Sequence, residues 1–155
     1  MAVDAAALRA CPLFKGFTDT GLSIIASIAQ PRAFPRGAAL FSENAPGDSL
    51  LILTEGTVRL SARSSAGEET TLGDVGPGEP LGELSLVQQG PRLCTATAGT
   101  DVLAVEIRHG DFQQLLAAKP QACIKLLMGI VAHVGQKLRD NREAWRSLVG
   151  KGASM

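Results

Sequence analysis

Aromatic and histidine side chains are scarce in this chain of 155 residues, and their scarcity narrows the chemistry that the chain can perform. Aromatic residues make up 4% of the sequence, with no tyrosine and one tryptophan, and the two histidines are His109 and His133. Metal-dependent enzymes built on β-barrels need two or three clustered histidines with a carboxylate. Two histidines so far apart do not supply that cluster, and both are expected to be structural or to face solvent. We therefore expect a binding protein without metal, cofactor or catalytic turnover.

The chain also lacks an excess of either charge, a long apolar run and paired cysteines. Its 15 basic and 15 acidic residues give a formal net charge of zero, which indicates neither nucleic acid nor an acidic membrane surface as a partner. No apolar run approaches the roughly 18 residues of a membrane span, and residues 1–10 lack the apolar core of a signal peptide. Cys11, Cys94 and Cys123 form no CxxC pair and are expected to be buried thiols in a reducing cytoplasm.

The middle of the sequence, by contrast, is rich in closely spaced turns. These turns include Pro46-Gly47, Glu55-Gly56, Gly76-Pro77-Gly78 and Gly90-Pro91. Short apolar segments separated in this way, here over residues 32–107, are typical of an all-β sandwich or barrel. Residues 57–63 alternate apolar and polar, with Ser61 expected to face outward, whereas residues 50–53 are apolar on both faces. The second segment should therefore lie deeper than the first.

Helical patterns flank this β region on both sides. Thr18 or Asp19 can cap a short helix that runs through Ala29 and stops at Pro31. After the β region, one short helix is expected to end before Pro120, which then opens a long helix. The predicted architecture is therefore mainly β with helices at each end.

The segment Leu81-Gly82-Glu83-Leu84-Ser85-Leu86, followed by Pro91-Arg92, combines three parts of a site for an anionic sugar. Glycine lets the backbone approach a ligand closely, and a helical turn over residues 83–87 would direct free N–H groups at an anion. Arginine pairs with phosphate through its forked guanidinium, and an ionised glutamate accepts a hydrogen bond from a ribose hydroxyl. The ligand that fits these groups is a nucleotide.

This segment resembles the phosphate-binding cassette of cyclic nucleotide-binding domains, the sensor modules of catabolite activator protein, protein kinase A regulatory subunits and gated channels. The run from Pro46 to Val58, a glycine-acid turn into an apolar strand and a second glycine turn, is similar to the family's other signature. The resemblance covers roughly residues 20–148 and implies a β-roll, a jelly-roll-like barrel, within a single domain of residues 1–155. Its expected parts are an N-terminal helical segment (1–30), the β-roll (31–107), C-terminal helices including a long one (108–148) and a tail (149–155).

The resemblance also implies the ligand, a cyclic mononucleotide with cAMP favoured over cGMP, and the residues that bind it. These are Gly82, Glu83, Leu84, Ser85, Arg92, Leu93 and Cys94. Leu93 and Cys94 depart from the family, which usually has Ser, Thr or Ala and then Ala at these positions. Leu93 removes a hydroxyl donor, which would weaken binding by about tenfold to a hundredfold. If Leu93 instead fills the phosphate position, the domain no longer binds nucleotide and acts as a dimerisation or protein-interaction module.

Each of the three main site residues can also be explained without a ligand. Gly82 can be a turn glycine, Glu83 a solvated acid in a first helical turn, and Arg92 a surface arginine. Their joint spacing after the first signature favours a binding site over these separate explanations.

The long C-terminal helix carries an apolar stripe at alternating spacings of three and four residues. Its members are Ile124, Leu127, Val131, Val134, Leu138, Asn141, Trp145 and Leu148. This spacing indicates a helix–helix seam, with Asn141 setting its register, and the family resemblance implies that the seam joins two copies of the chain in a homodimer. Alternatively, the whole stripe packs on its own barrel. In the dimer hypothesis ligand binding moves this helix and an unknown effector protein responds. The few residues beyond the helix predict no helix-turn-helix DNA-binding domain.

Overall fold

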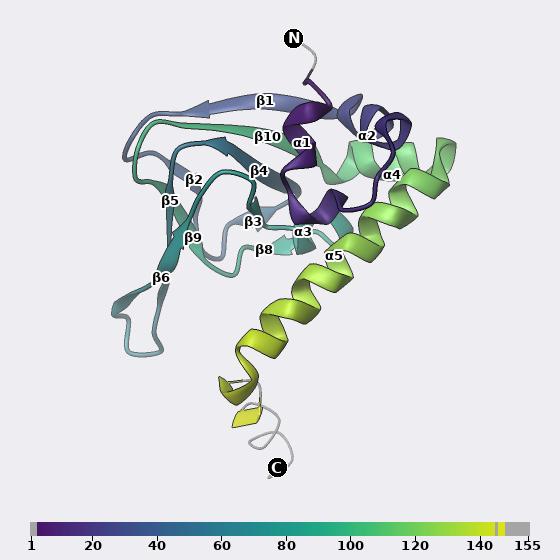
Figure 1. Cartoon of the computed structure of the whole chain (residues 1–155). Helices are drawn as coiled ribbons and strands as arrows, with labels where there is room; N and C mark the ends of the chain where they lie inside the picture. Colours follow the sequence, from purple (N-terminus) through teal and green to yellow (C-terminus); the bar gives the residue numbers. More distant parts are fainter. Residues whose placement is uncertain (1–2, 145, 148–155) are drawn as a thin grey trace.

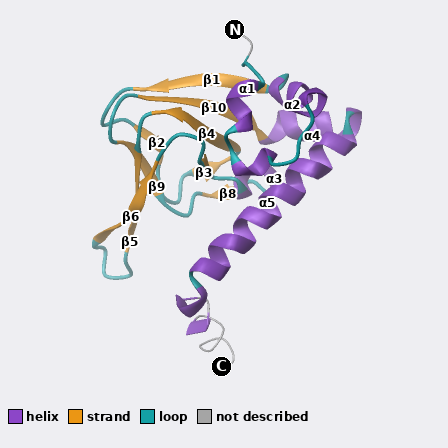
Figure 2. Ribbon diagram, viewed as in Figure 1, coloured by secondary structure: helices purple, strands orange, loops and turns teal. Residues whose placement is uncertain are grey.

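The computed structural model describes residues 3–144 and 146–147 and shows strands gathered on one side and helices on the other (Figures 1 and 2). The strands are β1 (Ala29–Phe34), β2 (Ala39–Phe41), β3 (Pro46–Gly47), β4 (Ser49–Glu55), β5 (Val58–Arg63), β6 (Glu69–Val75), β7 (Pro80–Leu81), β8 (Gly90–Pro91), β9 (Thr95–Ala98) and β10 (Val102–Arg108). The α-helices are α1 (Ala6–Arg9), α2 (Asp19–Ala26), α3 (Leu84–Val87), α4 (His109–Ala118) and α5 (Pro120–Asp140), with a 3-10 helix η1 (Pro12–Phe14).

The strands form two four-stranded antiparallel sheets and one short ladder. One sheet has the order β1-β10-β4-β7 and the other the order β2-β9-β5-β6, while β3 pairs with β8. Because neighbouring strands in the sheets are mostly distant in the sequence, the chain winds from one sheet to the other as a β-roll. The fold predicted from the turn spacing and the family resemblance is therefore confirmed.

Strand β4 separates two hydrophobic cores. Leu50 and Ile52 face the core that the helices cover, whereas Leu51 and Leu53 face the second core, inside the roll. All four side chains are buried, which agrees with the prediction that this segment lies deep. Burial of a leucine or isoleucine contributes about 1.5–3 kcal/mol, so β4 anchors both halves of the structure.

Two local features differ from expectation. Ser61 lies on the same face of β5 as Arg59 and lines a surface hollow with it, but its side chain is buried instead of exposed. Helix α2 begins after its Thr18 cap, as expected, but ends at Ala26. Pro31 lies inside β1 instead of stopping the helix, and β1 is an edge strand, where a missing N–H is tolerated.

Helix α5 packs closely on the domain at its midpoint. Pro120 occupies its first turn, as the sequence predicted, and Cys123, Leu126 and Ile130 are buried against the helix-side core. A Cβ atom at Gly129 would collide with the backbone carbonyl of Leu13 in η1. The two backbones therefore touch at this point, while the C-terminal half of α5 extends past the other helices (Figure 1).

The apolar stripe of α5 is divided between the interior and the surface. Leu127 and Val134 are partly buried against the helix-side core, whereas Ile124, Val131 and Leu138 are exposed. The alternative in which the whole stripe packs on its own barrel is therefore wrong.

Asn141 does not extend the stripe, because α5 ends at Asp140 and Asn141 caps it. The side-chain amide of Asn141 donates to the carbonyl of Lys137, and its backbone leaves the helical region. Trp145 and Leu148, the last predicted members of the stripe, lie outside the described residues. In the part of the chain that the structure describes, no helix has the length and apolar character needed to cross a membrane.

Candidate functional site

Gly82 and Gly47 make room for the side chain of Arg92. Gly82 follows β7 and has φ +69°, a conformation that glycine adopts readily. A Cβ atom there would collide with Nη1 of Arg92, and one at Gly47 would lie 2.6 Å from its Nε. The glycine that was expected to admit a ligand therefore also admits the arginine that would bind it.

Arg92 is a buried cation. Only 6% of the residue is exposed, its Nη1 donates to the carbonyl of Ser49 at 3.0 Å and its Nη2 to Ser49 Oγ at 3.3 Å. The guanidinium carbon lies 4.4 Å from the centroid of the Phe41 ring. Burial lowers the pKa of Arg92, although the charges of Asp48 and Glu106 act in the opposite direction. Nε is buried without a hydrogen-bond partner among the described residues, so one donor of the guanidinium is unused.

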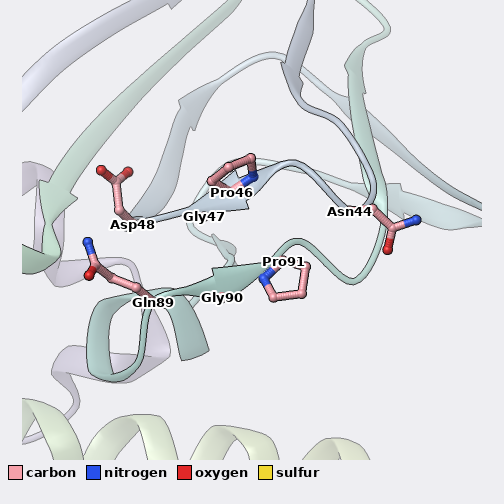
Figure 3. A pocket seen from close by; sticks show the side chains of 7 residues that line it. All are labelled: Asn44, Pro46, Gly47, Asp48, Gln89, Gly90 and Pro91. Carbon is pink, nitrogen blue, oxygen red and sulfur yellow. The ribbon is translucent and has the colours of Figure 1, made fainter.

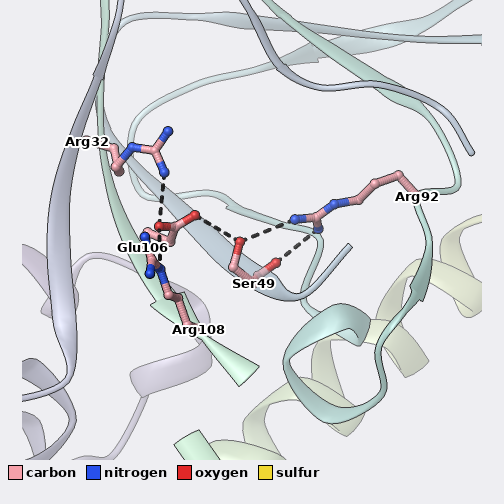
Figure 4. Close-up of polar contacts among 5 residues, drawn as sticks. All are labelled: Arg32, Ser49, Arg92, Glu106 and Arg108. Atoms are coloured by element: carbon pink, nitrogen blue, oxygen red, sulfur yellow. Dashed lines mark hydrogen bonds and ion pairs between the residues drawn. The ribbon is translucent and has the colours of Figure 1, made fainter. Parts of the chain in front are cut away.

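Behind Ser49 lies a second group of charges (Figure 4). Ser49 Oγ is 3.0 Å from Oε2 of Glu106, whose Oε1 is 3.0 Å from Nη1 of Arg32 and 3.4 Å from Nε of Arg108. Burial would raise the pKa of Glu106, but the hydrogen bond from Ser49 and the charge of Arg32 hold it below its ordinary value of 4.5. Glu106 is therefore an anion at neutral pH.

Glu83 connects the loop before α3 with α5. The residue is 5% exposed, and its Oε1 lies 2.8 Å from Nζ of Lys137 and 3.2 Å from Nδ1 of His133. Burial would raise its pKa, but the hydrogen bond and charge of Lys137, together with His133, hold the pKa below the ordinary 4.5. Glu83 is thus a buried carboxylate held by two side chains of α5, which excludes the alternative of a solvated acid.

The remaining predicted site residues differ in how deeply they are buried. Ser85 is buried, but its amide donates to the carbonyl of Gly82, so this N–H is not free as expected. Leu84 is exposed, and Leu93 is 78% exposed and does not fill the interior of the roll. Cys94 is half-buried instead of buried; burial and the charge of Glu43 raise its pKa.

A surface hollow of about 530 Å³ opens beside the β3–β8 ladder (Figure 3). Its lining residues are Asn44, Pro46, Gly47, Asp48, Gln89, Gly90 and Pro91. Neither Arg92 nor Glu83 lines this hollow, and its charged side chain is the carboxylate of Asp48. The hollow therefore does not itself suit an anion, although it adjoins the site around Arg92 through Gly47.

Three side chains of the site were not predicted as site residues: Ser49, His133 and Lys137. Ser49 directly follows the glycine-acid turn of the first signature, but the sequence does not indicate that its side chain contacts Arg92. His133 and Lys137 are four residues apart and share a helix face. That spacing could have indicated a paired contact, yet nothing local identifies Glu83 as its partner.

Comparison with known proteins agrees with this geometry. A family model described as "Cyclic nucleotide-binding domain" matches residues 31–119. The CRP-like cAMP-activated global transcriptional regulator of Mycobacterium tuberculosis is 35% identical over 115 residues, covering 74% of this chain and 51% of that protein. The Cyclic AMP receptor protein of Thermus thermophilus is 32% identical over 133 residues, covering 86% of this chain and 60% of that protein.

The chain thus spans only about half to 60% of the length of these curated relatives. Among solved structures, the N-terminal domain of a transcriptional regulator from Streptomyces coelicolor A3(2) superposes with a TM-score of 0.75 at 38% identity. That match covers 92% of this chain and 95% of the other. With the β-roll, the glycine-acid turns and the buried arginine in place, the chain belongs to the cyclic nucleotide-binding domain family.

Proposed function

We propose that this chain is a non-catalytic cytoplasmic sensor that binds a cyclic mononucleotide, cAMP in preference to cGMP. The observation that carries the proposal is the buried guanidinium of Arg92, whose Nε has no partner among the described residues. A buried donor on a cation suits the charged oxygens of a phosphate. The two relatives whose names include cAMP support this nucleotide as the ligand.

In this proposal Glu83 and Arg92 bind different parts of the nucleotide. Arg92 pairs with the cyclic phosphate, and Gly82, Glu83, Leu84 and Ser85 form the backbone wall beside it. Glu83 accepts the ribose hydroxyl through Oε2, since its Oε1 is engaged by α5. Residue Leu93 offers no hydroxyl and Cys94 only a weak donor, so we expect affinity weaker than a hydroxyl residue at position 93 would give.

Ligand binding is coupled to α5 through Glu83. The carboxylate that would receive the ribose is the one held by Lys137 and His133, so any shift of Glu83 changes the contacts of α5. A ligand moves this equilibrium only if it binds one arrangement more tightly, with typical coupling of about 1–3 kcal/mol. Ligand binding thus shifts the position of α5, and an effector protein binds one of the two arrangements of the helix.

A homodimer through α5 completes the proposal. The exposed apolar side chains of α5 lie along its outer side, where a second copy of the helix would cover them. They are Ile124, Met128, Val131 and Leu138. The single domain of residues 1–155 would then act without contacting nucleic acid or a membrane.

Isothermal titration calorimetry with cAMP and cGMP tests the ligand. Wild-type protein should bind one nucleotide per chain, and Arg92→Met should weaken binding by about thirtyfold to several thousandfold. Methionine keeps much of the buried volume, but Arg92 is nearly fully buried, so circular dichroism must first show that the variant is folded. Arg59→Met, at an exposed arginine of β5, is the matched control and should bind like wild type.

The second candidate is a degenerate domain that no longer binds nucleotide and serves as a dimerisation or protein-interaction module. The non-hydroxyl residues Leu93 and Cys94 and the engagement of Glu83 by Lys137 favour it. No heat and no thermal stabilisation at millimolar cAMP or cGMP would support this candidate. Equal affinity of the wild type and Arg92→Met would refute the assignment of Arg92.

A further inference from the structure

We infer that Ser49 and Glu106 are positioning residues that hold the guanidinium of Arg92 in one orientation from behind. The importance of this positioning for ligand binding rests on the proposed function, in which Arg92 binds the phosphate. A chain of contacts runs along one face of the sheet, from Arg92 through Ser49 of β4 and Glu106 of β10 to Arg32 and Arg108 (Figure 4).

The direction of each hydrogen bond in this chain follows from the groups themselves. An arginine N–H can only donate and an ionised carboxylate can only accept. Ser49 Oγ must therefore accept from Nη2 of Arg92 and give its single proton to Oε2 of Glu106. With its hydroxyl proton directed at Glu106, Ser49 presents a lone pair to Arg92.

The strand register places these residues together. Ser49 lies opposite Arg108 in the β4–β10 pairing, and Glu106 lies opposite Leu51, two residues along β4 on the same face. Both Ser49 and Glu106 are buried. The support is therefore built into two central strands and does not depend on a mobile loop.

The contacts with Ser49 leave Arg92 able to bind an anion. Its guanidinium has five N–H donors, of which Ser49 accepts two, through its carbonyl and its hydroxyl. Nε and the second hydrogen of each terminal nitrogen remain for the ligand. Holding a charged side chain in its binding orientation reduces the conformational entropy lost on binding.

Nuclear magnetic resonance of arginine-labelled protein tests the positioning directly and needs no nucleotide. A held guanidinium gives separate Nη–H signals because its rotation is slow, and Arg92→Lys identifies the signals of Arg92 by their loss. Ser49→Ala and Glu106→Gln should merge or broaden these signals, and Ser49→Thr should preserve them because it keeps the hydroxyl. Ser61→Ala is the matched control, since Ser61 is also a buried serine of a strand in the roll.

Calorimetry with cAMP then measures the effect on binding. Ser49→Ala should weaken affinity by about five- to twentyfold, Glu106→Gln by about three- to tenfold, and Ser61→Ala by less than about twofold. If wild type binds no cAMP but the Nη–H signals change as described, the proposed function fails and the positioning role stands. Unchanged Nη–H signals in both Ser49→Ala and Glu106→Gln would overturn the inference, whatever the affinities.

Discussion

Replacing Lys137 by methionine removes one charge from the contact between Glu83 and α5 while keeping most of the side chain's length. At the observed 2.8 Å, two unit charges attract by about 1.5 kcal/mol in water and about 6 kcal/mol at an effective dielectric constant of 20. The side chain of Glu83 is 7% exposed but that of Lys137 is 55% exposed, so solvent screening and lysine entropy reduce the net value. We expect Lys137→Met to lower the free energy of unfolding by about 1–3 kcal/mol at pH 7.

The loss should depend on pH in a defined direction. The pKa of Glu83 in the folded protein is below its ordinary 4.5, so its ion pair stabilises the fold fully above about pH 4.5. That stabilisation disappears as the pH falls through the folded pKa, because the carboxyl becomes neutral in both states. Urea denaturation followed by circular dichroism, from pH 7 down to about pH 3, measures the difference between the wild type and Lys137→Met.

The control for this series is Lys119→Met, at an exposed lysine that precedes the same helix. It should change stability by less than about 0.5 kcal/mol at every pH. A Lys137→Met loss that is as large at pH 3 as at pH 7, or that never exceeds that of Lys119→Met, would refute the ion-pair explanation.

Three further predictions concern close contacts and thiols. Gly82→Ala should lower the free energy of unfolding by about 1–3 kcal/mol in urea, and less in an Arg92→Ala background, where the colliding Nη1 is gone. Gly129→Ala should lower the melting temperature by several degrees, because its methyl group collides with the carbonyl of Leu13; an unchanged melting temperature would contradict this packing. Iodoacetamide should label Cys94 before the two buried cysteines, as mass spectrometry of digests can show, and slowly at neutral pH because burial raises the pKa of all three thiols.

The β-roll could be predicted because its signals are local. Turn glycines and prolines mark the strand ends, and the two-sided apolar run of β4 marks a strand between two cores. The burial of Ser61 could not be predicted in this way. Alternation along β5 indicates which face a side chain occupies, but it does not reveal what covers that face.

Only part of the candidate site could be predicted from the sequence. Gly82, Glu83 and Arg92 lie within a short segment, so their spacing showed that they belong together. Lys137 meets Glu83 across 54 positions of sequence, and Ser49 meets Glu106 across 57. Such contacts depend on how α5 and the strands pack, and the residue types alone do not specify them.

The contact between Gly129 and Leu13 is the point about which α5 would tilt in the proposed coupling. The helix ends at Asp140, eleven positions beyond Gly129, a distance of about 16 Å at the usual helical rise. A tilt of about 10° around the glycine would move that end by roughly 3 Å and Lys137 by roughly 2 Å. The same tilt would move the buried Cys123, six residues before the glycine, by roughly 1.6 Å in the opposite direction. In the proposed coupling, loss of the bond to Glu83 would therefore be accompanied by a shift of α5 in the helix-side core.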